Sequence, residues 1–307
     1  MNPLRMLRKR NYFPIFLAFL LLFALFLPLD LIFSLSFASA ETNDKKICYW
    51  EAEKNGRISL LFGTMHILSG GYLKNLKERI KSSDIIIVEI DDFAESNVKL
   101  VQAATFPQHQ SLKKSISPEV YNKAVDYFSQ KGLTKVVLDR FKPWYLGLMA
   151  QLLQSQEFIT FKTLPMDLYI LKLAQTYKVP TLGLETVEEQ ISCFEKLSMK
   201  AQEAFLEESI DPRTKQEMVT LKNLYLQGKL EEIENFLEET IDAQQSKELY
   251  HVIYTERNHR MNAVILPYAE KGNAFIAVGF GHLVTETGVV HFLEKKGFTV
   301  TKKSLIW

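Results

Sequence analysis

The sequence predicts an α/β fold with a mixed, largely parallel central sheet, helices on its flanks and a large helical insertion. Three observations lead to this prediction. Short apolar runs alternate with helical patterns at both ends of the chain. The run DIIIVEI at residues 84–90 is apolar and β-branched, which is typical of a strand covered on both faces. Between residues 188 and 269 the pattern is almost wholly helical, with acidic amphipathic stretches such as GKLEEIENFLEETI.

The first forty residues have the pattern of a signal peptide. The basic stretch RMLRKR precedes the apolar run FPIFLAFLLLFALFLPL, and a small-residue Ala-Ser-Ala pattern ends at Ala40, where the chain turns polar. We therefore expect residues 1–40 to be removed, residues 41–307 to form one domain, and the mature protein to be periplasmic or secreted. The alternative is an uncleaved inner-membrane anchor, because residues 13–37 could span a bilayer.

The composition excludes several classes of protein. The chain has 307 residues, of which 47% are hydrophobic and 24% charged, with a formal net charge of +1. This balance is that of a globular protein, and it offers no basic surface for nucleic acid. Cys48 and Cys193 could form one disulfide in an oxidising compartment or remain two buried thiols, and they are too few for a thiolate zinc site.

In the N-terminal half, strands alternate with helices. RISLLF at residues 57–62 becomes apolar before a glycine and predicts a strand, and residues 73–82 have helical spacing. DIIIVEI then predicts the second strand. Pro118 opens a helix expected to end near residue 131, because proline is favoured at the first helical position, and Pro143 opens another through LGLMAQLLQ.

In the C-terminal half, short strands are expected near residues 158–161 and 181–184, on either side of the helix DLYILKLAQTYK. After the helical insertion, AFIAV at residues 274–278 predicts a buried strand. A helix starting near Thr285 and a strand at residues 299–302 close the chain. No low-complexity linker divides the mature chain, so a single domain is expected.

Polar residues follow the apolar strands at four places. His66 and His282 each end a Gly-x-x-His motif after a strand, Glu89 ends the DIIIV strand, and Glu185 follows TLGL. Ligands and catalytic groups of open α/β sheets gather beyond the carboxyl ends of the strands, so these side chains are expected to share one site. The glycines of the two motifs are expected to form tight turns through positive φ, and they are Gly63, Gly279 and Gly281.

The chemistry of these four residues fits a metal site. Two imidazoles and two carboxylates could bind Zn²⁺, Mn²⁺ or Co²⁺ and leave a position for water. Each residue also has a simpler interpretation, since a histidine after a strand is commonly a satisfied loop residue and Glu185 suits the first turn of a helix. The repeated strand-Gly-x-x-His pattern favours the shared site, and we expect His66 and His282 to face each other across an open cleft, with Glu89 between them.

Motifs of other enzyme classes are absent from the sequence. It contains no His-Glu-x-x-His motif and no Gly-x-Ser-x-Gly elbow, which disfavours a conventional zincin and a serine α/β-hydrolase. GFGHLV lacks the third glycine of a dinucleotide-binding fingerprint. The remaining histidines lie in polar or helical settings where a surface position is expected, and they are His109, His251, His259 and His291.

Several motifs together resemble the TraB/GumN family, which includes the Tiki proteases. They are GTMH and GFGH, the VEID strand end, FKPWYLGLMAQLL, PMDLYILKLAQTYKVPTLGLET, TERNHRMNAVI and GHLVTETGVVHFLEKKGFTV. The resemblance covers residues 50–302. It implies an α/β core related to the erythromycin-esterase and ChaN-like folds, with His66, His282 and Glu89 as the metal and catalytic centre. Arg257 and Asn258 also match a family feature and would project from a helix toward the site.

The resemblance implies an extracytoplasmic, metal-dependent hydrolase of the Tiki-like peptidase type. His66 and His282 would bind a divalent ion of Mn, Co or Zn, and Glu89 would be a ligand or the base. Glu185 would orient an imidazole, and Arg257 would stabilise the oxyanion of a peptide or small extracytoplasmic substrate. Two alternatives stay open: a metal-independent hydrolase using histidine and glutamate, and a non-enzymatic envelope protein that binds haem, metal or peptide.

Overall fold

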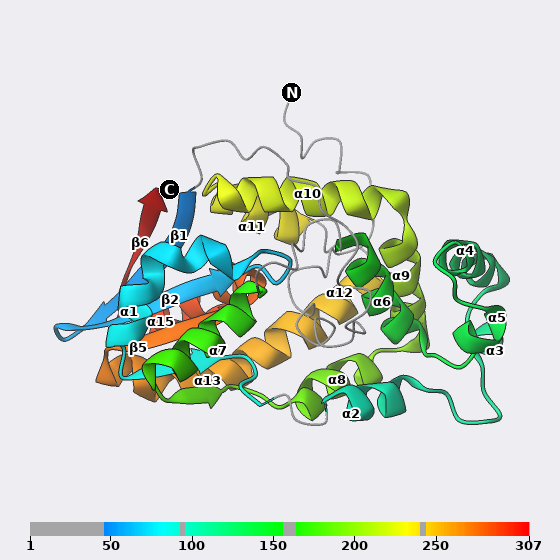
Figure 1. Cartoon of the computed structure of the whole chain (residues 1–307), viewed down its shortest axis with the longest axis horizontal. Helices are drawn as coiled ribbons and strands as arrows, with labels where there is room; N and C mark the ends of the chain where they lie inside the picture. Colours follow the sequence, from blue (N-terminus) through cyan, green and yellow to red (C-terminus); the bar gives the residue numbers. More distant parts are fainter. Residues whose placement is uncertain (1–45, 93–95, 156–163, 240–243, 307) are drawn as a thin grey trace.

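The structure is a computed structural model that describes residues 46–92, 96–155, 164–239 and 244–306. A six-stranded sheet lies at one end of the molecule, and a set of helices lies at the other (Figure 1). The strands are β1 (Lys46–Lys54), β2 (Arg57–Thr64), β3 (Ile85–Val88), β4 (Thr181–Gly183), β5 (Ala274–Gly279) and β6 (Thr299–Ile306).

The sheet is mixed and mostly parallel, as predicted. Its strand order is β4-β3-β5-β2-β1-β6. The four strands from β4 to β2 run parallel, whereas β1 is antiparallel to both β2 and β6. Every residue of β5 is buried, which explains the continuous apolar run AFIAVG at the centre of the sheet. The carboxyl ends of four neighbouring strands therefore meet at one edge.

Helices make up most of the rest of the described chain. Before β3 come the 3₁₀ helix Gly70–Leu76 and α1 (Lys77–Ser82). Between β3 and β4 lie α2 (Ser96–Ala104), α3 (Leu112–Ser115), α4 (Pro118–Ser129), α5 (Lys135–Leu138), α6 (Pro143–Ser155) and α7 (Met166–Tyr177). Between β4 and β5 lie α8 (Val187–Lys196), α9 (Met199–Ile210), α10 (Pro212–Leu226), α11 (Leu230–Glu239), α12 (Gln244–Tyr250), the π-helix His251–Thr255 and α13 (Glu256–Lys271). After β5 come α14 (Phe280–Val284) and α15 (Val289–Lys295).

The expected helical insertion is present, and a second helical segment joins it. The helices between β4 and β5 begin with α8, which has a capping box formed by Thr186 and Glu189. α4 and α6 come from the earlier segment between β3 and β4, and both pack on α9 of the later one. This helical part has its own apolar cluster, which includes Leu112, Phe128 and Leu206. Two insertions into the sheet therefore build one helical layer.

Most predicted elements are confirmed, with differences at the ends. β1 was not predicted, because charged residues interrupt its apolar pattern; its long pairings with β2 and β6 stabilise it instead. The helix expected to start near Thr285 begins at Val289 as α15. A short helix that was not predicted, α14, begins at Phe280 directly after β5 and contains His282. The closing strand extends to Ile306. The strand expected at residues 158–161 lies outside the described residues.

The motif glycines are needed for close packing and not for positive φ, which corrects the expectation from sequence. None of Gly63, Gly279 and Gly281 has a positive φ. A Cβ at Gly63 would lie 2.9 Å from a ring carbon of Phe280, and one at Gly281 would lie 2.4 Å from the ring of Tyr254. The two glycines therefore let α14 lie directly against β2 and against the π-helix, which brings His282 close to the sheet edge.

Both cysteines are free, buried thiols in this structure. Cys48 lies beside the carbonyl oxygen of Gly228, and the Cys193 thiol contacts the carbonyl oxygen of Glu189. Of the two alternatives left open by the sequence, the structure therefore shows two separate thiols and no disulfide between them.

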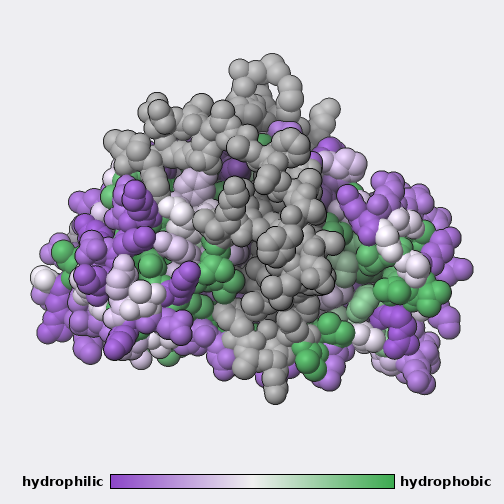
Figure 2. All heavy atoms as spheres, in the orientation of Figure 1, coloured by the Kyte–Doolittle hydropathy of each residue, from purple (hydrophilic) through white to green (hydrophobic). Residues whose placement is uncertain are grey.

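The surface of the described part is largely polar. Hydrophilic residues cover most of what Figure 2 shows of it, and green areas appear at the right-hand end, where Figure 1 places α5. Val136 and Val137 of α5 are both exposed. Within the described ranges, no helix has the length and apolar character needed to cross a membrane. The signal or anchor predicted at the N-terminus lies outside those ranges.

Candidate active site

Four parallel strands deliver the predicted polar residues to one edge of the sheet. His66 follows β2, Glu89 follows β3, Glu185 follows β4, and His282 lies in the first turn after β5. The registers align the ends of these strands, since Thr64 pairs with Gly279 in the parallel ladder between β2 and β5. The carboxyl-end rule thus brings residues from distant parts of the chain together. All four side chains are buried.

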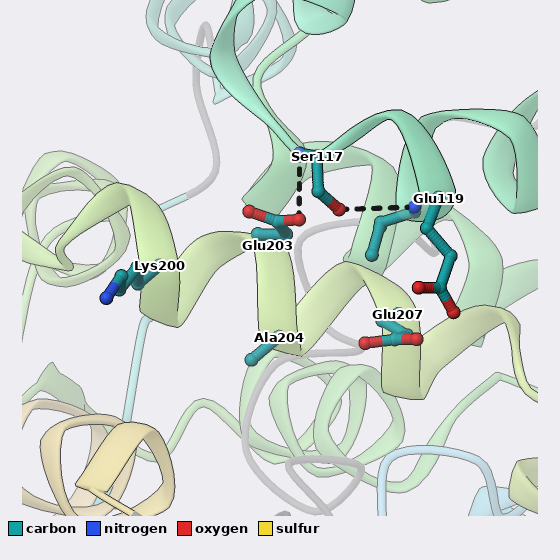
Figure 3. A pocket seen from close by; sticks show the side chains of 7 residues that line it. Ser117, Glu119, Lys200, Glu203, Ala204 and Glu207 are labelled. Atoms are coloured by element: carbon teal, nitrogen blue, oxygen red, sulfur yellow. Dashed lines mark hydrogen bonds between the residues drawn. The ribbon is translucent and has the colours of Figure 1, made fainter.

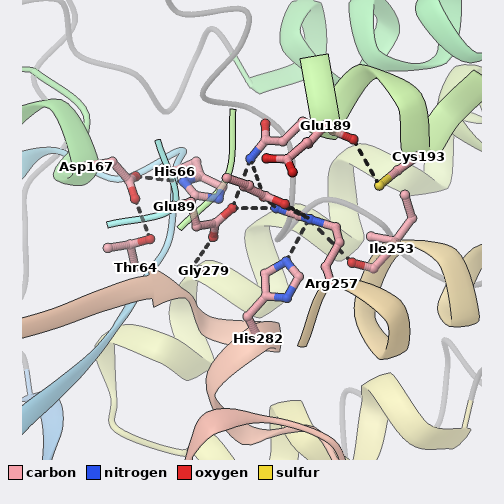
Figure 4. A network of polar contacts seen from close by, with 12 residues as sticks. Thr64, His66, Glu89, Asp167, Glu189, Cys193, Ile253, Arg257, Gly279 and His282 are labelled. Atoms are coloured by element: carbon pink, nitrogen blue, oxygen red, sulfur yellow. Dashed lines mark hydrogen bonds and ion pairs between the residues drawn. The ribbon is translucent and has the colours of Figure 1, made fainter. Parts of the chain in front are cut away.

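Arg257, in the first turn of α13, lies at the centre of this group (Figure 4). Its Nε donates to both oxygens of Glu185, at 3.0 and 3.1 Å, and its Nη2 donates to Glu185 Oε1 and to Glu89 Oε2, the latter at 2.8 Å. Its Nη1 lies 2.8 Å from His282 Nε2 and 3.4 Å from the carbonyl oxygen of Ile253. These contacts engage all five N–H groups of the guanidinium.

The charge of Arg257 is stabilised in a fully buried position. Burial by itself disfavours the charged guanidinium, but Glu185 and Glu89 outweigh that effect and raise the pKa of Arg257. Because every donor is already engaged, a direct contact with a substrate oxyanion would require breaking one of these bonds. The oxyanion role expected for Arg257 therefore stays a prediction, and the geometry presents it as an organiser of two carboxylates and one imidazole.

Glu89 and Glu185 share Arg257 and a glutamine. Gln190 of α8 donates from Nε2 to Glu185 Oε1 at 2.8 Å and to Glu89 Oε2 at 3.3 Å. The other oxygen of Glu89 accepts a 2.6 Å bond from the backbone N–H of Gly279 at the end of β5. Burial raises the pKa of Glu89, although Arg257 and His66 oppose the shift. In this structure Glu185 binds arginine and glutamine and contacts no imidazole, which differs from the support role expected for it.

His282 is held with both ring nitrogens engaged. A guanidinium only donates, so His282 Nε2 must accept from Arg257, and its proton lies on Nδ1, 2.7 Å from Asn258 Oδ1. Asn258 is anchored in turn by donating to the hydroxyls of Thr285 and Thr287, at 3.2 and 3.0 Å. Burial, Arg257 and His66 together lower the pKa of His282 well below its usual value. His282 is therefore a neutral imidazole whose lone pair is already used.

His66 has one engaged ring nitrogen and one that has no partner among the described residues. Its Nδ1 lies 2.7 Å from Oδ2 of Asp167, and the other oxygen of Asp167 accepts a 2.6 Å bond from the Thr64 hydroxyl. No described residue makes a hydrogen bond to His66 Nε2, although the atom is buried. Burial opposes the charged ring, but Asp167 and then Glu89 outweigh it and raise the pKa of His66.

Two residues of this network were missed from sequence. Asp167 and Gln190 are buried polar side chains in the first turns of α7 and α8. Asp167 had a usable signal, since it is an acidic residue in the first turn of a largely apolar helix and lies two residues after Pro165. Gln190 had no such signal, because a glutamine that follows two glutamates in the first turn of a helix is normally expected to be exposed to solvent.

The expectation of an open cleft is wrong. His66 is 2% exposed and His282 is 0% exposed, so neither lines an open surface. A surface pocket lies elsewhere, between α4 and α9, and Figure 3 shows that Ser117, Glu119 and Glu203 are among its lining residues. The other histidines lie at the surface as expected, with His109, His251 and His259 exposed and His291 partly buried beside Glu234.

The donor atoms match a divalent metal ion in kind but not in arrangement. Among the residues that the structure describes, no three His, Cys, Asp or Glu side chains are grouped so as to hold an ion. The lone pair of His282 Nε2 points at Arg257, a cation that already contacts Glu89 and Glu185. In this arrangement the residues do not fit a bound metal ion. Among the candidate metal-ligating atoms of the described network, only His66 Nε2 has no hydrogen-bond partner.

Comparison with known proteins adds the family context. A sequence model of the TraB/PrgY/gumN family matches residues 48–302. A protein of Amphimedon queenslandica named as a metalloprotease TIKI homolog is 23% identical over an alignment 327 residues long, which includes 83% of this chain and 61% of that protein. The chain thus spans less than two thirds of the length of this relative.

Proposed function

Because the chain belongs to the TraB/PrgY/gumN family, we propose that it is a hydrolase that cleaves a peptide or a small extracytoplasmic substrate with a water molecule activated at His66. Two lines support this proposal. The relative from Amphimedon queenslandica carries the name of a metalloprotease, which indicates hydrolysis by that protein. The network at the sheet edge contains a base, carboxylates and a fixed cation, which are the groups that hydrolysis requires.

The observation that carries the proposal is the free ring nitrogen of His66. A buried polar atom without a partner costs free energy, so its presence at a sheet edge calls for a partner that comes from outside the described protein. A water molecule or a substrate group is such a partner. The pKa of His66 is raised by Asp167 and Glu89, which makes its ring a stronger base than an ordinary imidazole.

The proposed reaction uses His66 twice. Its Nε2 takes a proton from water while the water oxygen attacks the scissile carbonyl carbon. When the carbon–nitrogen bond breaks, the protonated ring returns that proton to the leaving amine, so that the ring ends as it began. Glu89 lies near enough to stabilise the protonated ring electrostatically, since its negative charge favours the charged form of His66.

The remaining residues hold this carboxylate in place. Arg257 and the backbone N–H of Gly279 each bond one oxygen of Glu89, and Glu185 anchors Arg257 through Nε and Nη2. We propose that Glu89 stabilises the protonated ring of His66 and that Arg257 and Glu185 hold Glu89 in position. His282 would support the same network through its bond to Arg257.

A metal-dependent form of the same hydrolysis is the second candidate. The name of the relative favours it, and so does the free nitrogen of His66, which is a good donor for Mn, Co or Zn. Binding an ion between His66 and His282 would require Arg257 to release His282 first. Elemental analysis of protein purified without chelators, together with activity before and after EDTA, separates the two candidates.

The activity itself is tested with the mature protein and a peptide library read by mass spectrometry. We expect cleavage by the wild type and a loss of at least about 10²-fold in His66→Gln, since a general base contributes that much or more. His291→Gln is the matched control and should be silent, because His291 lies at the surface beside Glu234. Full activity of the His66 variant would refute the proposal. No cleavage by the wild type, with a new absorption band on adding haem, would favour the binding-protein alternative.

A further inference from the structure

We infer that Asp167 is a positioning residue that holds His66 as the tautomer with its proton on Nδ1 and its lone pair on Nε2. The effect of Asp167 on catalysis rests on the proposed function. The tautomer itself does not, because it follows from the contacts of the resting protein. Asp167 is 6% exposed and belongs to α7, about a hundred residues from His66 in the chain.

The hydrogen bonds around Asp167 determine which His66 nitrogen carries the proton. Asp167 Oδ1 accepts from the Thr64 hydroxyl at 2.6 Å, and Oδ2 lies 2.7 Å from His66 Nδ1. An ionised carboxylate only accepts, so His66 Nδ1 must donate. A neutral imidazole has one N–H, and Nε2 is therefore left with the lone pair that a base needs.

The backbone fixes Asp167 against the loop that carries His66. Met166 donates its N–H to the carbonyl oxygen of Leu68 at 3.0 Å, and Gly70 donates to that of Leu164 at 2.7 Å. Gly70 also lies so close to Tyr169 that a Cβ there would be 2.1 Å from the tyrosine Cβ. The start of α7 is thus tied to the His66 loop on both sides of the carboxylate. These contacts fix the main chain at Asp167, and the bond from the Thr64 hydroxyl holds the carboxylate toward the ring.

Asp167 would act in both halves of the proposed reaction. While Nε2 takes the proton from water, the ring becomes positively charged and its Nδ1–H still points at the carboxylate, which stabilises that charge. When Nε2 returns the proton to the leaving amine, the ring regains the same tautomer. Both oxygens of Asp167 are engaged, one by Thr64 and one by His66, so Asp167 positions His66 and is not itself a catalytic group.

Asp167→Asn separates this role from simple space filling. The Thr64 hydroxyl is fully buried and donates to Asp167, so the asparagine carbonyl oxygen should stay toward Thr64 and the amide toward His66 Nδ1. The amide donates, and the ring must then accept on Nδ1 and carry its proton on Nε2. Asparagine has nearly the same shape as aspartate, so the fold should survive.

The test combines nuclear magnetic resonance with kinetics on the mature protein. In ¹⁵N-histidine-labelled wild type, at a pH where the ring is neutral, we expect His66 to show a protonated Nδ1 and an unprotonated Nε2. His66→Gln identifies these signals. In Asp167→Asn the His66 proton should instead lie on Nε2, with Nδ1 unprotonated. The kcat should then fall by up to roughly 10⁴-fold with little change in KM, which is the size of effect seen for a base held in the wrong tautomer. Asp126→Asn, at an exposed position on α4, is the control and should change neither.

The outcomes distinguish this inference from the proposed function. A wild-type His66 with its proton on Nε2 would overturn the inference even if Asp167→Asn failed to fold. Unchanged kcat in Asp167→Asn with the tautomer reversed would overturn the catalytic consequence. The expected tautomer in a protein that cleaves nothing would leave the positioning by Asp167 standing and refute the hydrolase.

Discussion

Replacing Arg257 by methionine should be among the most destabilising single changes at this site. The guanidinium is completely buried, and its partners Glu89 and Glu185 have side chains only 1% and 2% exposed. Methionine fills a similar volume but leaves both carboxylates without a counter-charge and leaves His282 Nε2 without its donor. Removing one partner of a buried ion pair costs about 3–5 kcal/mol, because the remaining charge stays buried.

That cost is a large part of the stability of an ordinary domain, which is about 5–15 kcal/mol. At an m value of about 3 kcal/mol per M of urea, the unfolding midpoint of Arg257→Met should fall by roughly 1–1.7 M. Arg260→Met is the matched control. Arg260 is 40% exposed and lies 3.9 Å from Glu185, so its loss should cost no more than about 1 kcal/mol.

The loss of stability in Arg257→Met should also depend on pH in a defined direction. Burial raises the pKa of Glu89 even with Arg257 beside it, and removing Arg257 raises it further. A carboxyl group whose folded pKa exceeds its unfolded value of about 4.3 is favourable to the fold below that value and loses this contribution as pH rises through the folded pKa. The difference between wild type and Arg257→Met should therefore be larger at about pH 8 than at about pH 5.

Urea unfolding followed by circular dichroism measures both effects. A variant within about 1 kcal/mol of wild type at both pH values would refute the reasoning, since it would mean that the carboxylates find solvent or other partners without Arg257. Equal losses for the Arg257 and Arg260 variants would show that burial does not set the strength of this ion pair.

Three further predictions concern packing, thiols and processing. Gly281→Ala should lower stability by about 1–3 kcal/mol in thermal denaturation, because its Cβ would overlap the ring of Tyr254; an unchanged melting temperature would show that α14 can move. Thiol titration of the unfolded mature protein should give two free thiols. The double variant Cys48→Ser, Cys193→Ser should keep peptidase activity, although Arg257 and Glu185 influence the pKa of Cys193 electrostatically. A disulfide or a loss of activity would contradict this prediction. The mass of protein recovered from the periplasm should place the mature N-terminus at or near Glu41, and an intact chain in the membrane would favour the anchor.

Sequence reasoning reached the location of the site but not its bonds. His66, Glu89, Glu185 and His282 were found because each follows an apolar strand, and the ends of parallel strands meet at one edge. Their roles came from residue chemistry together with the family resemblance, which implied histidines as metal ligands and Arg257 as an oxyanion donor. The structure instead pairs Arg257 with both glutamates and with His282, and leaves one nitrogen of His66 free in the described network.

The sequence by itself determined the α/β class, the strands that the two histidines and two glutamates of the site follow, and the edge where those strands end. These features follow from local patterns, since apolar periodicity and strand-end glycines need only neighbouring residues. Only the tertiary structure decided burial, pairing and tautomers. Asp167 lies 101 residues from His66, and Arg257 lies 168 residues from Glu89. Which donor meets which acceptor over such separations depends on how helices pack on the sheet, and no local pattern contains that information.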